Sequence, residues 1–222
     1  MKNRRRLGAV IAVAVALFIA LANGAVVRAD DVQCTGTLGK TQVDNLIVPD
    51  GAACTLNGTR VGGNIILNTN AALNAQGVRV EGNIQAENSG EIVVGSGSTV
   101  DGDIQLTRSG AAQILSVVID GNLQVEQNSG LLLADGNEID GDLQAFGNTG
   151  GVTVRNNTIG GNLQCQGNNP PPTGSGNVVR GDAEGQCSNL DESPAPAPTP
   201  IPTQPPPGGG QGQRLYLPVI GK

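Results

Sequence analysis

The 222-residue chain has no histidine and no tryptophan, and it contains only one tyrosine and two phenylalanines. A globular core of large side chains cannot be built from this composition, and almost no ring is available to stack on a sugar. Glycine is abundant instead, with 34 residues. Any core must therefore consist of Val, Ile, Leu and Ala held in a narrow, regular space.

A long apolar run occurs at the N-terminus, where residues 7–21 follow Lys2 and three arginines. Small residues come next, and Val27-Arg28-Ala29 matches a cleavage site. This layout predicts a secretory signal peptide over residues 1–29. An uncleaved membrane anchor is the alternative, and it is disfavoured because Asn23 interrupts the run short of a full span.

The rest of the chain lacks a basic cluster. Residues 1–29 hold five of the 13 basic residues and none of the 19 acidic ones, so the mature chain would carry a net charge of −11. Such a protein repels nucleic acid and anionic lipid. We therefore exclude DNA and RNA as partners.

No CxxC pair occurs among the four cysteines, which disfavours a zinc site. An even number of cysteines in an exported chain predicts disulfides instead. Cys34 and Cys54 are 20 residues apart, and Cys165 and Cys187 are 22 apart. We predict that these pairs are bonded and clamp the two ends of the repeat region described next, with Pro170–Pro172 absorbing the extra length of the second pair.

A seven-residue motif recurs at intervals of 19 or 20 residues. Its copies are VGGNIIL at 61, VEGNIQA at 80, VDGDIQL at 100, IDGNLQV at 119, IDGDLQA at 139, IGGNLQC at 159 and VRGDAEG at 179. A weaker copy, VDNLIV, begins at residue 43. Seven matches in phase indicate a repeat architecture in which each unit stacks on the next.

The first, fifth and seventh motif residues are apolar in nearly every copy, and the residues between them are mostly polar. This period of two predicts a strand with one buried face, and the many Gly, Asn and β-branched residues disfavour a helical repeat. The third residue is always Gly, and we expect that the tube is too tight for a side chain there or bends at a corner. Residues 30–190 are therefore predicted to form an all-β parallel β-solenoid of about seven to eight coils.

Equivalent side chains of stacked coils are expected to form ladders along the rod. The inward ladder is Val61, Val80, Val100, Ile119, Ile139, Ile159 and Val179. The outward ladders are Asn64, Asn83, Asp103, Asn122, Asp142, Asn162 and Asp182, and then Gln85, Gln105, Gln124, Gln144 and Gln164. Stacked amides can hydrogen-bond along the axis, and their expected role is that of a scaffold.

Residues 191–213 are rich in Pro and end in a run that contains Gly208–Gly210. This composition predicts a stiff polyproline spacer followed by a flexible joint. Residues 214–222, RLYLPVIGK, form a short apolar tail. The tail lacks the threonine, apolar span and basic end of a sortase signal, so it is interpreted as either a docking tag or a nonfunctional end.

Two cysteine-bearing blocks carry a family resemblance: VPDGAACTLNGTRVGGNI at 48–65 and GNLQCQGNNPPPTGSGNVVRGDAEGQC at 161–187. They resemble a family of secreted bacterial proteins whose members are uncharacterised, and the resemblance covers about residues 34–187. It implies a right-handed parallel β-helix and export, and it brings no activity with it.

The predicted function is that of a non-catalytic structural or interaction module, secreted or displayed at the bacterial cell surface, without a cofactor. Its partner would be an envelope or extracellular component, and end-to-end or surface self-association is a second option. The alternative is a polysaccharide lyase or hydrolase, or a carbohydrate-binding β-helix, because parallel β-helices commonly host such activities. The scarcity of aromatic residues and of extended loops that could shape a cleft argues against a lyase or hydrolase.

Acidic residues recur at the second motif position of four successive copies: Glu81, Asp101, Asp120 and Asp140. Asp103 and Asp142 occupy the fourth position of their copies. A hydrolase would draw its paired carboxylates from the five aspartates of this set, with Arg108 as the basic residue in the coil of Asp101 and Asp103. The set also predicts a weak calcium site, because carboxylates stacked about 4.8 Å apart repel one another and calcium binds several oxygen ligands.

Millimolar calcium is therefore expected to raise Tm modestly, and magnesium is expected to raise it less because it demands a stricter geometry. In a variant with both Asp101→Asn and Asp120→Asn, we expect the calcium response to disappear and the baseline Tm to rise, since the repulsion is removed too. Thermal unfolding at low ionic strength measures both effects. An unchanged wild-type Tm in calcium would identify the acidic row as a solvated face.

Overall fold

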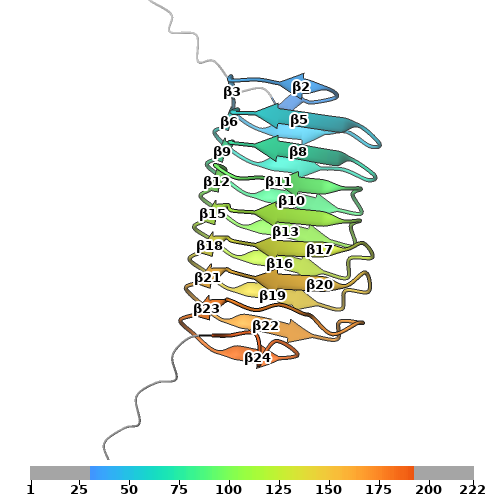
Figure 1. Ribbon diagram of the computed structural model, residues 1–222. Coiled ribbons are helices and arrows are strands. Elements are labelled where there is room, and N and C mark those ends of the chain that lie inside the picture. The colour runs from blue at the N-terminus through green and yellow to red at the C-terminus, as the bar shows by residue number, and fades with distance from the viewer. Residues whose placement is uncertain (1–30, 193–222) are drawn as a thin grey trace, which may run out of the picture.

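The structure is a computed structural model that describes residues 31–192, and these residues form a rod of stacked β-coils (Figure 1). The predicted signal peptide at 1–29, the tail at 214–222 and nearly all of the linker at 191–213 lie outside the described residues. Residues 31–192 contain strands, turns and bends but no helix, and all strand pairs are parallel, so the predicted β-solenoid is confirmed. No helix in this part is long and apolar enough to cross a membrane.

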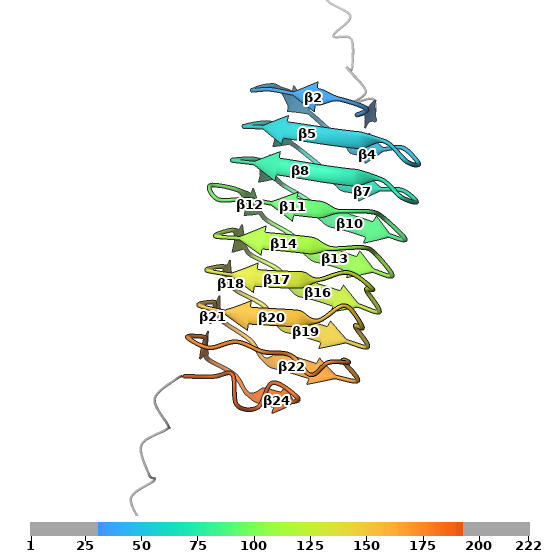
Figure 2. The same cartoon turned by 45° about the vertical axis from the view of Figure 1, so that its right-hand side comes forward.

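Three parallel sheets run along the rod, here called sheets A, B and C, and a complete coil contributes one strand to each (Figures 1 and 2). Sheet A contains β1 (Val32–Gln33), β4 (Leu46–Val48), β7 (Ile65–Leu67), β10 (Ile84–Glu87), β13 (Ile104–Thr107), β16 (Leu123–Glu126), β19 (Leu143–Phe146), β22 (Leu163–Gln166) and β24 (Ala183–Gly185). Sheet B contains β2 (Thr37–Leu38), β5 (Ala53–Asn57), β8 (Ala72–Gln76), β11 (Ile92–Val94), β14 (Ala112–Leu115), β17 (Leu132–Asp135) and β20 (Val152–Arg155). Sheet C contains β3 (Gln42–Val43), β6 (Arg60–Val61), β9 (Arg79–Val80), β12 (Thr99–Val100), β15 (Val118–Ile119), β18 (Glu138–Ile139), β21 (Thr158–Ile159) and β23 (Val178–Val179).

The described strands make seven complete coils, an eighth coil and the final strand β24. In the eighth coil, a single bridge at Thr173 takes the place of a sheet B strand. The sheet B strands run to the left at the front of Figure 1, the sheet A strands run to the right behind them, and the chain descends with each turn. The coil is therefore right-handed, which is the hand that parallel crossover connections prefer.

The seven-residue motif does not form one continuous strand, and this part of the prediction was wrong. Its first residue ends a sheet C strand, its next three residues form a corner, and its last three begin a sheet A strand. In the copy at residue 100, these parts are Val100, Asp101–Asp103 and Ile104–Leu106. The alternation of apolar and polar residues continues across the corner. Val100 before the corner and Ile104 and Leu106 after it all point into the core and are buried.

The corner between sheets C and A explains why the third motif residue is always Gly. A Cβ on Gly121 would lie 2.6 Å from the carbonyl oxygen of Gly102 and closer still to Oδ1 of Asp103, both in the preceding coil. The same crowding occurs at Gly82, Gly102, Gly141, Gly161 and Gly181. A side chain is excluded here because the polar ladder of the preceding coil occupies its space.

The core is one thin column of aliphatic side chains. The predicted inward ladder from Val61 to Val179 is at most 4 % exposed throughout, and it lies on sheet C. Sheet A adds inward pairs such as Ile84 and Ala86, and sheet B adds pairs such as Ile92 and Val94. Because each coil is only about 4.8 Å high, it buries these side chains against its neighbours rather than within itself.

The alternation between 19 and 20 residues comes from single-residue insertions in two turns. Four residues separate Ala75 from Val80, whereas five separate Val94 from Val100. Between sheets A and B, five residues separate Ala86 from Ile92, whereas six separate Val125 from Leu132 and Ala145 from Val152. The insertions lie in turns, so the strands on either side stay in register from coil to coil.

Gly121→Ala is expected to lower the free energy of unfolding by about 2–4 kcal/mol, because the contact can be relieved only by moving two stacked main chains. Gly39→Ala is the matched control: a Cβ on Gly39 would meet nothing within 4 Å. That control should change the stability by less than about 0.5 kcal/mol. Denaturant unfolding compares the two, and equal effects would contradict a steric role for the corner glycine.

Candidate functional site

Both predicted disulfides are present, one near each end of the rod. The Cα atoms are 5.5 Å apart in Cys34–Cys54 and 5.3 Å apart in Cys165–Cys187, within the range that a disulfide needs. No cysteine in the described part is free, which is compatible with an extracellular protein.

The spacing of the second disulfide has a different cause from the predicted one. Cys165 is in register with Gly185, so Cys187 lies two residues beyond the equivalent position. The coil from Leu163 to Ala183 is no longer than the coil before it, because the prolines at 170–172 replace residues rather than adding them. The two extra residues therefore follow β24.

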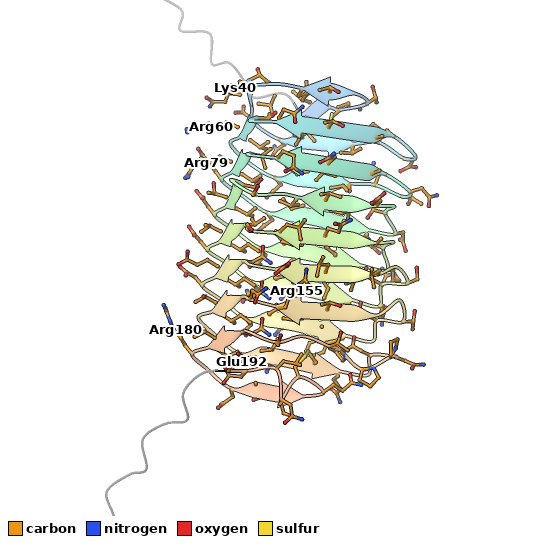
Figure 3. All side chains as sticks on the ribbon, in the orientation of Figure 1. Lys40, Arg60, Arg79, Arg155, Arg180 and Glu192 are labelled. Atoms are coloured by element: carbon orange, nitrogen blue, oxygen red, sulfur yellow. A yellow bond between two sulfur atoms is a disulfide. The ribbon has the colours of Figure 1, made fainter. Side chains whose placement is uncertain are left out.

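The acidic row predicted at the second motif position lies at the corner between sheets C and A. Two of its members are paired with arginines of sheet C: Nη2 of Arg79 is 2.7 Å from Oδ2 of Asp101, and Nη1 of Arg60 is 3.8 Å from Oε1 of Glu81. Figure 3 shows Arg60 and Arg79 one above the other along one edge of the rod. These partners were missed because only the stacking of coils brings together residues about one coil apart in the chain.

The arginine partner changes one consequence expected for the calcium variant. Asp101→Asn would remove the ion pair with Arg79 as well as the repulsion from its acidic neighbours. We therefore expect the gain in baseline stability to come from Asp120→Asn. Among the residues that the structure describes, no three Cys, Asp or Glu side chains are grouped so that they could hold a metal ion, and the calcium site stays a prediction.

Asp103 and Asp142 belong to a separate row at the same corner, and they are half-buried rather than simply outward as predicted. Oδ1 of Asp103 accepts a hydrogen bond from the main-chain N–H of Asn122 at 2.8 Å, and Oδ1 of Asp142 accepts one from Asn162 at 2.7 Å. The same bond repeats along the row, with Oδ1 acceptors on Asn45, Asn64, Asn83, Asn122 and Asn162. The predicted ladder thus exists, and it joins side chains to the main chain of the next coil.

Two buried asparagine ladders close the other corners, and the sequence analysis missed both. Asn128, Asn148 and Asn168 lie between sheets A and B, whereas Asn137, Asn157 and Asn177 lie between sheets B and C; all are at most 4 % exposed. Oδ1 of Asn148 accepts the N–H of Asn128 at 2.9 Å, and its Nδ2 donates to the carbonyl of Val125 at 2.9 Å. Their 20-residue spacing was the available signal.

Asp135, in β17, is a carboxyl group with a lowered pKa. Nδ2 of Asn156 donates to its Oδ1 at 2.9 Å, and Nε of Arg155 donates to its Oδ2 at 2.9 Å. The hydrogen bond from Asn156 and the charge of Arg155 hold the pKa of Asp135 below its ordinary value, although burial acts in the opposite direction. This carboxylate therefore stays ionised and links β17 to β20.

The outer face of sheet A carries the predicted glutamine ladder. Nε2 of Gln85 donates to Oε1 of Gln105 at 3.1 Å. The same contact joins Gln124 to Gln144 and Gln144 to Gln164, and the ladder ends on Glu184. Toward the N-terminal end of the rod, the same row continues as Ile66 and Ile47. This face is therefore polar over most of its length.

A hollow of about 630 Å³ opens on this face, and it is the candidate functional site. Outward side chains of sheet A and residues of the turns that follow its strands line it. They include Asp50, Ile66, Asn68, Thr69, Gln85, Glu87, Asn88, Gln105, Thr107 and Arg108. Arg108 forms an ion pair with Glu87. The sequence analysis did not find this hollow, because its members come from four coils.

Comparison of the chain with protein-family models, curated proteins and solved structures finds no match. The family resemblance of the two cysteine-bearing blocks therefore stays a prediction.

Asn148→Ala is expected to lower the free energy of unfolding by about 2–5 kcal/mol, because the N–H of Asn128 and the carbonyl of Val125 lose their partners in a buried site. Asn74→Ala is the control, since Asn74 is exposed and its side chain bonds only to Gln76. Its effect should stay within about 0.5 kcal/mol. Similar denaturation midpoints for the two variants would show that the buried ladder does not hold the coils together.

Proposed function

We propose that this protein is an exported, non-catalytic β-solenoid that acts as a rigid structural or interaction module at the bacterial cell surface. The observation that carries this proposal is that side-chain ladders run along all three corners of the rod. A disulfide near each end adds a covalent clamp where a stack of coils would otherwise fray. Such a rod keeps its shape without a large core, which suits a spacer or display element.

Two of the carboxylates that a hydrolase would use, Asp101 and Asp103, have structural partners in the rod. Asp101 is paired with Arg79, and Asp103 accepts a main-chain N–H. These partners support a scaffold role for the acidic residues.

Export is supported by three features that agree with one another. Residues 1–29 have the layout of a signal peptide. The two disulfides suit an oxidising compartment. The Pro-rich segment at 191–213 would hold the rod away from whatever its C-terminal tail contacts.

The test combines location with activity. On intact cells of the source organism, antibodies to the rod should label the surface, and the protein recovered there should lack residues 1–29. Incubation of the purified protein with neutral and acidic polysaccharides should release no reducing ends and no unsaturated products. A variant with Asp101→Asn and Asp103→Asn should fold normally, because Asn already occupies the position of Asp103 in other coils.

Two outcomes would contradict the proposal. Detection of the full-length chain only inside the cell would contradict the surface role. Products formed by the wild-type protein and lost in the double variant would make the lyase or hydrolase alternative the better one.

A further inference from the structure

We propose that the hollow on the outer face of sheet A, together with Phe146 farther along that face, binds a linear neutral or N-acetylated oligosaccharide that lies along the rod axis. This inference names a partner class for the interaction role proposed above and rests on that role, because a rod displayed at a cell surface meets extended glycans.

The hollow presents groups that match the hydroxyls of a sugar. Each side-chain amide of Gln85 and Gln105 offers both a donor and an acceptor, and the hydroxyls of Thr69 and Thr107 can act as either. A sugar hydroxyl also donates and accepts, so such a surface can satisfy both of its roles. The bond between Gln85 and Gln105 and the bond from Gln105 to Oδ2 of Asp103 orient these amides in advance.

Phe146 stands in the same outward row as two residues of the hollow. Strand register places Glu87 next to Thr107, Thr107 next to Glu126, and Glu126 next to Phe146. With coils about 4.8 Å apart, the ring lies about 10 Å beyond Thr107 along the axis. Phe146 is the one aromatic side chain of the described part, and it is half-buried on an outer face instead of packed in the core. A ring in this position can stack on the C–H face of a sugar.

The charges along this track indicate which glycans fit. Asp50, Glu87 and Glu126 lie in or beside the hollow, and the cation there, Arg108, is already paired with Glu87. The track is therefore net negative, and it repels polyuronates and phosphate-bearing glycans. Neutral and N-acetylated sugars carry no such penalty.

An extended peptide fits this surface less well. Strand addition needs an open sheet edge, and specificity for a peptide needs pockets for its side chains. The strands β7, β10 and β13 under the hollow are each paired on both sides. Ile66 is the outward apolar side chain of the hollow. An oligosaccharide, which carries many hydroxyls, therefore matches this amide-rich surface better than a peptide with apolar side chains does.

The test is a titration of the full chain with cellohexaose and with the fully N-acetylated chitohexaose. NMR signals of the side-chain amides and of the Phe146 ring monitor the binding. We expect millimolar binding that shifts the signals of Gln85, Gln105 and Phe146. Phe146→Ala and Gln105→Leu should each weaken binding by about three- to tenfold. Gln113→Leu is the matched control on the outer face of sheet B, and it should leave the affinity unchanged. Thermal unfolding confirms that each variant is folded.

Three results would overturn the assignment. The first is the absence of any shift with either hexasaccharide at millimolar concentrations. The second is a loss of affinity in Gln113→Leu equal to that in Gln105→Leu. The third is stronger binding of hexagalacturonate than of the neutral sugars. Failed binding by a rod that is displayed on cells would refute this inference alone, whereas sugar binding by a rod that is not displayed would refute the surface role alone.

Discussion

The rod depends on one interaction: a hydrogen bond at each corner between a main-chain N–H and the side-chain oxygen of the equivalent residue in an adjacent coil. Where the chain leaves a strand, it loses its regular sheet partners, and a buried N–H without a partner is costly. Between sheets C and A, the later residue donates to the earlier side chain, as in Asn122 to Asp103. At the other two corners the direction is reversed, as in Asn128 to Asn148. The hydrogen bonds at the corner between sheets C and A therefore point toward one end of the rod, and those at the other two corners point toward the opposite end.

Several features of the sequence follow from that bond. The glycine next to the Asp or Asn is required because the oxygen of the preceding coil occupies the space of a Cβ. Insertions are confined to turns, where an extra residue does not shift the ladder. The inward residues are committed to a narrow core, so only the outward rows remain for function. Of these, the outer face of sheet A combines amides, a hollow and an aromatic ring, and this combination makes it the surface that we assign to a ligand.

Prediction from the sequence succeeded where one coil repeats the next. The inward ladder from Val61 to Val179, the glutamine row and both disulfide pairs were all derived from their spacing and are present. It failed where the chain turns. The motif was interpreted as one strand because every second residue points inward across this corner, which gives the same apolar pattern as a straight strand. The buried asparagines were missed, because Asn is common in turns and its burial cannot be recognised without the neighbouring coil.

The sequence by itself determined the repeat, its all-β character, the stacking of the coils and the cysteine partners, because each of these depends on residues that recur at a constant interval. The tertiary structure alone decided which polar residues face inward, which arginine meets which carboxylate, and where a hollow opens. Arg79 and Asp101 are about one coil apart in the chain, yet their side chains meet at 2.7 Å. Strand register places Arg79 beside Thr99, two residues before Asp101, and the repeat length alone does not show that the two side chains face each other.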